Sequence, residues 1–169
     1  MPGQRGGQGQ RRGPRRDGPQ RGGGGEEFEQ KILDLSRVTR VTAGGKRMRF
    51  RACVAIGDLK GRVGVGLAKG LDVSSAVTKA TARAKKEIVH VPIVRETIPF
   101  DVNVKFKAAT VLMKPAPKGT GIIAGGVVRL ILTLAGVPNV AAKMLGSSNR
   151  VTNAKATMRA LAELEARTS

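Results

Sequence analysis

One stretch of the chain limits its possible folds more than any other. From residue 47 to residue 56 every second residue is apolar. In the first half of this stretch the alternate residues are arginines. This period of two predicts a β-strand with one apolar face and a basic outer edge. The apolar positions are Met48, Phe50, Ala52, Val54 and Ile56, and the basic ones are Arg47, Arg49 and Arg51. Glycine-containing turns flank the strand at 43–46 and 57–61, which favours an antiparallel sheet.

The neighbouring segments extend this strand into a small domain. Residues 28–35 are amphipathic and lie beside three glutamates, which predicts a short helix because acidic side chains favour a helix N-terminus. Strands are expected at 36–42 and 62–68. Asp72 is a candidate N-cap for a helix that runs to about Val89, with apolar residues at helical spacing. The expected order is helix, three antiparallel strands, helix.

A change of pattern between Pro92 and Pro99 indicates a second unit. Strands are predicted at 100–106 and 109–114, and a glycine-rich loop follows at 118–126. The remaining predicted elements are an apolar helix through 127–134 that ends at Gly136, a strand at 140–145 and a helix at about 153–166. The whole chain is therefore expected to have an α+β fold, with an α/β second domain.

We divide the chain into an arm at 1–27, a first domain at 28–91 and a second domain at 92–169. The first 25 residues contain ten Gly and six Arg and have almost no apolar side chains. Such a composition does not offset the entropy cost of ordering, so the arm is predicted to be disordered on its own. It is either a plain soluble tail or a basic arm that contacts RNA phosphates.

The charge of the chain indicates its class of partner. The formal net charge is +19, from 31 Lys+Arg against 12 Asp+Glu. An excess of this size favours nucleic acid first and an anionic membrane surface second. The longest apolar-rich stretch, 121–137, is too short to span a membrane and contains Gly125, Gly126 and Arg129. With no apolar signal segment after Met1, we expect a cytoplasmic protein without a membrane partner.

Catalysis and cofactor binding have little support. Cys53 and His90 are the only cysteine and histidine, which excludes an internal disulfide and makes Cys/His chemistry improbable. The glycines of 119–126 lack the following Gly-Lys-Ser/Thr of a phosphate-binding loop, and Glu87 with His90 lacks the further carboxylates of a metal site. Trp and Tyr are absent, which favours recognition of RNA through phosphates and shape over base stacking. We predict no enzyme activity, no cofactor and no metal.

The basic residues near the central strand are the candidate RNA-binding set. No acidic residue occurs between Arg37 and Ile56, so the ordinary alternative of a solvated, charge-balanced face is disfavoured. Each phosphate that the set neutralises should steepen the salt dependence of binding by roughly 0.7–0.9 on a log–log plot. The candidate residues are Arg37, Arg40, Gly44, Gly45, Lys46, Arg47, Arg49, Arg51, Arg62, Lys69, Lys114 and Lys118.

Six segments, taken in order, resemble one family, the fifth small-subunit ribosomal protein of bacteria. The resemblance covers about residues 28–165. The segments are Arg37–Lys46, Arg49–Asp58, Gly61–Lys69, Lys114–Gly126, Ala135–Asn139 and Gly146–Asn149. The chain departs from the family pattern at Ala43, where Lys is frequent, and at Leu67 and Ala68, where an aromatic residue and Gly are frequent.

The resemblance implies a first domain like double-stranded-RNA-binding domains and a second α/β domain with a left-handed βαβ crossover. It implies binding to small-subunit ribosomal RNA, contacts with small-subunit proteins four and eight, and a place near the messenger RNA entry and decoding region. In that place the family supports subunit assembly and translational accuracy. The loop 43–47 would reach RNA, whereas the surface that meets protein four would comprise Gly121, Gly125, Gly126 and Arg129.

Two other functions remain open at this stage. A free-standing double-stranded-RNA chaperone or regulator would share the basic hairpin, but it would bind arbitrary duplexes as well as ribosomal RNA. A nucleotide-dependent enzyme would have to use the glycine-rich loop, and it would bind ATP or GTP.

Overall fold

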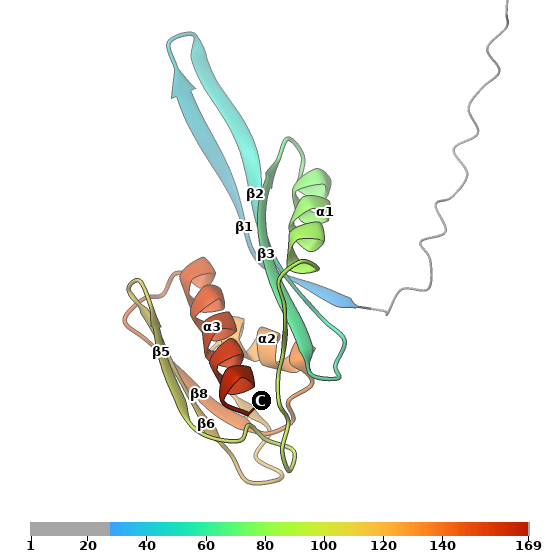
Figure 1. Ribbon diagram of the computed structural model, residues 1–169. Helices are drawn as coiled ribbons and strands as arrows, with labels where there is room; N and C mark the ends of the chain where they lie inside the picture. Colours follow the sequence, from blue (N-terminus) through green and yellow to red (C-terminus); the bar gives the residue numbers. More distant parts are fainter. Residues whose placement is uncertain (1–27, 169) are drawn as a thin grey trace, which may run out of the picture.

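The computed structural model describes residues 28–168, which form two β-sheets and three helices (Figure 1). The arm predicted at 1–27 lies outside the described residues. The first sheet has the order β1-β2-β3-β4 and is antiparallel, and helix α1 lies against it. Its elements are β1 (Glu29–Thr42), β2 (Gly45–Gly57), β3 (Arg62–Gly70), α1 (Val73–Ala84) and β4 (Ile88–His90).

The second sheet has the order β5-β6-β8-β7 and is mixed, because β7 and β8 are parallel and helix α2 connects them. Its elements are β5 (Val102–Phe106), β6 (Ala109–Pro115), β7 (Ile122–Ile123), α2 (Gly126–Ala135), β8 (Val140–Leu145) and α3 (Arg150–Thr168). The expected fold class is confirmed: an antiparallel sheet with a helix, followed by an α/β domain. Gly136 ends α2 in the left-handed region (φ 76°), as predicted.

The helix predicted at 28–35 is wrong. These residues belong to β1, which pairs with β2 along nearly its whole length, from Glu29 opposite Gly57 to Thr42 opposite Gly45. A long antiparallel partner strand offers a pair of backbone hydrogen bonds at every second residue, and these outweigh the weak helical preference of a short segment. A register shift between Ile32 and Asp34 lets Leu33 enter the core while Ile32 stays half exposed.

The helix that begins after Asp72 is shorter than predicted. It ends at Ala84, and Ile88–His90 form strand β4 on the edge of β3, so the expected three-stranded sheet has a fourth short strand. Ile88 and Val89 are β-branched, and β3 provides a free edge for them to pair with. Asp72 occupies the N-cap position, but its side chain makes no capping hydrogen bond; its backbone carbonyl accepts one from the Ala76 N–H (3.0 Å).

Both faces of the first sheet are covered in its lower part, where β2 is buried. On one face, the alanines Ala76, Ala80 and Ala84 of α1 pack against it so closely that a Cβ added at Gly66 would collide with the Ala80 carbonyl. On the other face, residues such as Cys53 share one continuous core with α2, α3 and the second sheet. The two domains are therefore packed into one body.

Backbone hydrogen bonds fix this packing at the β2–β3 turn. The Leu59 N–H donates to the Leu134 carbonyl (3.0 Å) and the Gly61 N–H to the Ala135 carbonyl (2.8 Å). Gly136 lies so close to the Leu59 carbonyl that any side chain at that position would collide with it. The end of α2 is thereby attached to the first domain.

Candidate nucleic-acid interface

The ends of β1 and β2 form a hairpin arm that extends past the rest of the fold (Figure 1). Residues 39–49 are all exposed, whereas the lower part of β2, residues 52–57, is buried. The change from polar to apolar sequence along β2 thus marks the point where the strand enters the core. Among the described residues, this projecting hairpin carries the basic row that the sequence predicted.

Strand register places the basic side chains on one face of the hairpin. Arg40 is opposite Arg47, and Arg51 is opposite Lys69 of β3, and residues directly opposite each other point to the same side of a sheet. This is the side away from α1, because the alternate residues of β2 pack against that helix. Arg37 and Lys46 lie on the opposite side, since their partners are Phe50 and Val41.

A shallow groove of about 270 Å³ runs along this basic face. No carboxylate lines it. Like charges held this close repel one another in the free protein, so a polyanion that enters the groove relieves the repulsion as well as binding. Its lining residues are Val38, Thr39, Arg40, Arg47, Arg49 and Lys69.

Arg51 has a mixed role at the base of the groove. Its guanidinium is 3.8 Å from the Asp34 carboxylate, so an acid from β1 partly compensates its charge. Its Nε and the Ser36 hydroxyl, from the opposing position, are buried without a hydrogen-bond partner within the described chain. Arg51 is therefore less available than Arg47 and Arg49, which are exposed and make no ion pair within residues 28–168.

The main chain is accessible at the tip of the hairpin. Gly45 has φ 138°, a conformation that side chains disfavour, and the Thr42 hydroxyl donates to its carbonyl (3.0 Å). A Cβ added at Gly44 or Gly45 would meet nothing within 4 Å. The glycines therefore leave space for another surface to approach the main chain.

The remaining predicted RNA-binding residues lie elsewhere. Arg62 sits at the far end of the first sheet, where its Nε donates to Asp58 (2.6 Å) and its guanidinium lies over the Phe28 ring (5.5 Å). Lys114 is on β6 in the second sheet. Lys118 hydrogen-bonds to Glu96 (2.9 Å), a contact that raises the pKa of the lysine. Arg62, Lys114 and Lys118 are not part of the hairpin groove.

Asp58 is the group that holds Arg62. Burial alone would raise the pKa of Asp58, but hydrogen bonds from the Arg62 side chain and from the backbone N–H groups of Lys60 and Arg62 outweigh it and lower the pKa. Arg62 therefore supports the β2–β3 turn that attaches the two domains.

The glycine-rich segment is organised by a residue that sequence reasoning missed, the buried Asn139. Its Oδ1 accepts the N–H groups of Gly119 (3.1 Å) and Gly121 (3.0 Å), and its Nδ2 donates to the Glu96 carbonyl (3.1 Å). Asn139 is 5% exposed, one of few polar residues at that level in the described chain. A Pro-Asn pair two residues after the helix-ending Gly136 was the available signal, because asparagine side chains often hydrogen-bond to the backbone of a turn.

The predicted protein-interface residues share one end of α2. Gly121, with φ 72°, and Gly126 each have open space where a Cβ would stand, and Arg129 is exposed on the helix. Gly125 differs, because a Cβ there would collide with the Met144 side chain. The accessible members of the set are therefore Gly121, Gly126 and Arg129.

Cys53 is buried, and burial raises the pKa of its thiol to about 11. Glu87 and His90 do not share a helix, because α1 has ended before them. Within residues 28–168, no group of three or more His, Cys, Asp or Glu side chains is placed to hold a metal ion. Over the same residues, no helix is long and apolar enough to cross a membrane.

Two family models match the chain. Residues 28–92 match ribosomal protein S5, N-terminal domain, and residues 104–168 match ribosomal protein S5, C-terminal domain. The small ribosomal subunit protein uS5 of Thermotoga neapolitana is 47% identical over 139 residues, 82% of this chain and 78% of that protein. Protein uS5c of Cyanophora paradoxa is 47% identical over 140 residues (82% and 83%), and uS5 of Campylobacter jejuni is 48% identical over 140 residues (83% and 95%).

The fold, the basic hairpin and these matches define a structural ribosomal protein, and not an enzyme. The chain belongs to the ribosomal protein S5 family.

Proposed function

We propose that this chain is a structural component of the small ribosomal subunit and that it binds the subunit RNA through the hairpin groove. The observation that carries this proposal is the uncompensated row of Arg40, Arg47 and Arg49 on an arm that projects from the fold. A projecting, basic two-stranded arm can enter a groove or junction of RNA and contact phosphates from both sides. The open glycines at the tip support close contact between main chain and RNA.

The second element of the proposal is a protein contact at the end of α2. Gly121, Gly126 and Arg129 offer accessible backbone and one cation, and the Asn139 hydrogen bonds hold the preceding loop at Gly119 and Gly121. We propose small-subunit proteins four and eight as the neighbours, with the surface around Arg129 facing protein four. This arrangement would place the hairpin near the messenger RNA entry and decoding region of a cytoplasmic ribosome, where it would influence assembly and accuracy.

The test is the replacement of Arg40, Arg47 and Arg49 by Gln, which removes three charges without removing a packed side chain. We expect weaker binding to small-subunit RNA and a log–log salt slope that is flatter by about 2–3. The matched control replaces Lys79, Lys85 and Lys86, which are exposed on and after α1, by Gln. Equal loss in both variants would show that total charge, and not the groove, drives binding.

A second measurement distinguishes this proposal from the alternative, a free-standing regulator that binds RNA duplexes. The unmodified protein should co-sediment with small subunits at moderate salt and protect a defined region of their RNA from cleavage. Equal protection of arbitrary duplexes, with most of the protein free in lysate, would favour the regulator.

A further inference from the structure

Three cations converge on one aromatic ring in the second domain. Lys107, Lys155 and Arg159 lie 6.0, 5.9 and 4.5 Å from the centroid of the Phe106 ring. None of the three makes an ion pair within residues 28–168. They come from the β5–β6 turn and from α3, about 50 residues apart in sequence, so only the fold brings them together.

Two of these cations, Lys155 and Arg159, line a cavity between the two domains. It has a volume of about 390 Å³, within the range of small-molecule sites, and it lies between α3 and the β3–β4 edge. Val65, Ile88 and Met158 contribute apolar walls, and Phe106 and Arg159 also line it. This cavity thus combines cationic side chains with apolar walls.

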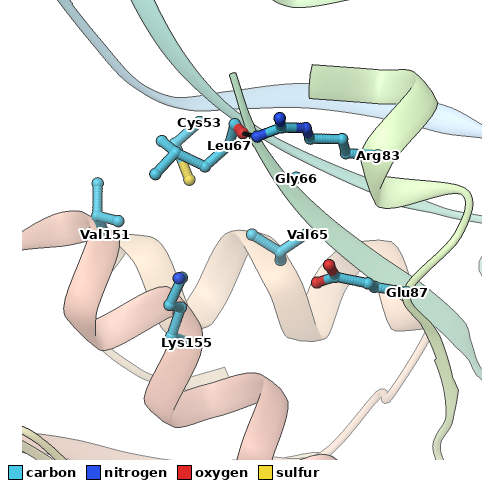
Figure 2. Close-up of a pocket in the computed structure, with 8 residues that line it drawn as sticks. All are labelled: Cys53, Val65, Gly66, Leu67, Arg83, Glu87, Val151 and Lys155. Atoms are coloured by element: carbon cyan, nitrogen blue, oxygen red, sulfur yellow. Dashed lines mark hydrogen bonds between the residues drawn. The ribbon is translucent and has the colours of Figure 1, made fainter. Parts of the chain in front are cut away.

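A second, smaller cavity of about 160 Å³ shares Val65, Glu87 and Lys155 with the first. Figure 2 shows Lys155 reaching from α3 toward the strands that carry Cys53 and Val65, with the Glu87 carboxylate turned into the same space. At its other end the Arg83 guanidinium donates to the Leu67 carbonyl (2.7 Å). The two cavities adjoin at these shared residues, and together they are called the recess; cations lie at its border, and Glu87 is the single carboxylate in its lining.

This combination fits a nucleotide. A base is flat and apolar on its faces and carries hydrogen-bond donors on its edge, which suits apolar walls with one carboxylate acceptor. A phosphate suits ammonium and guanidinium groups at the border. An acidic peptide fits less well, because its carboxylate side chains offer Glu87 no hydrogen-bond donor and offer the apolar walls no flat apolar face.

We propose that this recess is a second RNA site, which takes one unstacked nucleotide with its base in the cavity and its phosphate on Lys155 and Arg159. The inference deepens the proposed RNA-binding function and rests on it, but it shares no residue with the hairpin groove. Arg159 also presents a planar guanidinium, a surface on which a base can stack.

The test uses the full chain with Lys155 and Arg159 replaced by Gln, assembled with small-subunit RNA. Both side chains are exposed, so the thermal transition should remain close to that of the unmodified protein. We expect RNA affinity to fall about three- to tenfold and the log–log salt slope to flatten by roughly 0.7–0.9, the effect of one lost phosphate contact. The charge-matched control replaces Lys79 and Lys86 by Gln and should have little effect.

Ultraviolet cross-linking locates the contact. Peptides that contain Phe106 or residues 155–159 should cross-link to RNA in the unmodified assembly, and K155Q/R159Q should abolish these cross-links while hairpin cross-links remain. Cross-links from these peptides to protein alone, or equal affinity loss in the control, would overturn the proposal. A free 5′-mononucleotide that binds as tightly as RNA would also overturn the proposal, because the ligand of the recess would then be a soluble nucleotide and not RNA.

The hairpin variant distinguishes the failure of this inference from the failure of the function on which it rests. If R40Q/R47Q/R49Q leaves RNA binding unchanged, the proposed function fails at the hairpin. If that variant weakens binding and K155Q/R159Q does not, only the second site is rejected.

Discussion

At the scale of single residues, the side chains that organise the second domain and its junction with the first differ from those that carry the basic surface. Asn139 and Asp58 each satisfy several backbone groups at a place where the chain changes direction. Both are short polar side chains, and both are largely shielded from solvent. Their contributions can be measured separately, because they act in different loops.

Replacement of Asn139 by Ala should lower the free energy of unfolding by about 1–3 kcal/mol, the usual cost of leaving buried polar groups without a partner. The loss arises because the Gly119 and Gly121 N–H groups and the Glu96 carbonyl lose their bonds together. Urea unfolding measures it. The control is N103A at an exposed site on β5, which should change stability by less than about 0.5 kcal/mol. Equal effects would show that the network is not stabilising.

Asp58 should make stability dependent on pH. Its folded-state pKa is lowered, so its contribution is present above the unfolded-state pKa and is lost as the pH falls through the folded value. We expect the D58N variant to lose about 1–3 kcal/mol at pH 7. It should also show a smaller decline in acid than the unmodified protein. D101N, at an exposed position, is the control, and identical acid profiles for D58N and the unmodified chain would contradict the assignment.

At this scale the sequence predicted the placement of some candidate residues and not of others. Arg47 and Arg49 were identifiable because a period of two fixes which side chains share a face. Arg62 could not be separated from them, because its partner Asp58 depends on turn geometry that composition does not reveal. The Phe106 cluster was missed because Lys107 and Arg159 are brought together only by packing of α3 on β5.

At the scale of elements, the β1–β2 hairpin combines a packed base with a projecting end. The buried half of β2 holds the sheet together, and the exposed half adds almost nothing to the core. The end of the hairpin should therefore be removable.

A variant that replaces residues 39–48 by Asn-Gly, joining Val38 to Arg49, keeps their direct pairing. Its melting temperature should stay within a few degrees of the original, because the deleted residues are exposed. Its affinity for small-subunit RNA should fall at least tenfold, since three basic residues, Arg40, Lys46 and Arg47, and both tip glycines are lost. Circular dichroism and filter binding measure the two effects, and unaltered RNA binding would place the interface elsewhere.

Element prediction succeeded where a pattern was long and failed at element ends. The alternation in β2 and the apolar stripe of α2 gave the correct structures. The segment 28–35 was assigned to a helix because local signals ignore a partner strand that lies later in the sequence. The same reason explains β4, since Ile88–His90 are held by β3 and not by their own preference.

At the scale of the whole molecule, one core joins both domains. Leu33 and Cys53 from the first sheet share it with Ile131 of α2 and Leu161 of α3. The backbone bonds at Leu59 and Gly61 reinforce the same contact. The structure therefore predicts that the domains unfold together.

The thiol of Cys53 provides the measurement. It lies in the shared core, and its raised pKa of about 11 makes the folded-state thiol unreactive near neutral pH. We expect alkylation of Cys53 in native buffer to require the full free energy of unfolding and to follow the same urea transition as circular dichroism. Labelling at a clearly lower free energy would show that the domains separate before they unfold.

The shared core also has a consequence for the order in which the chain is made. The strands that carry Leu33 and Cys53 leave the synthesising ribosome before α2 and α3, which cover them. At about 5–20 residues per second, the roughly 90 residues from the end of β3 to the middle of α3 take on the order of 5–18 s. During that interval an apolar face of the first sheet stays exposed to solvent. The nascent first domain is thus incomplete until α2 and α3, which follow it in the same chain, cover this face.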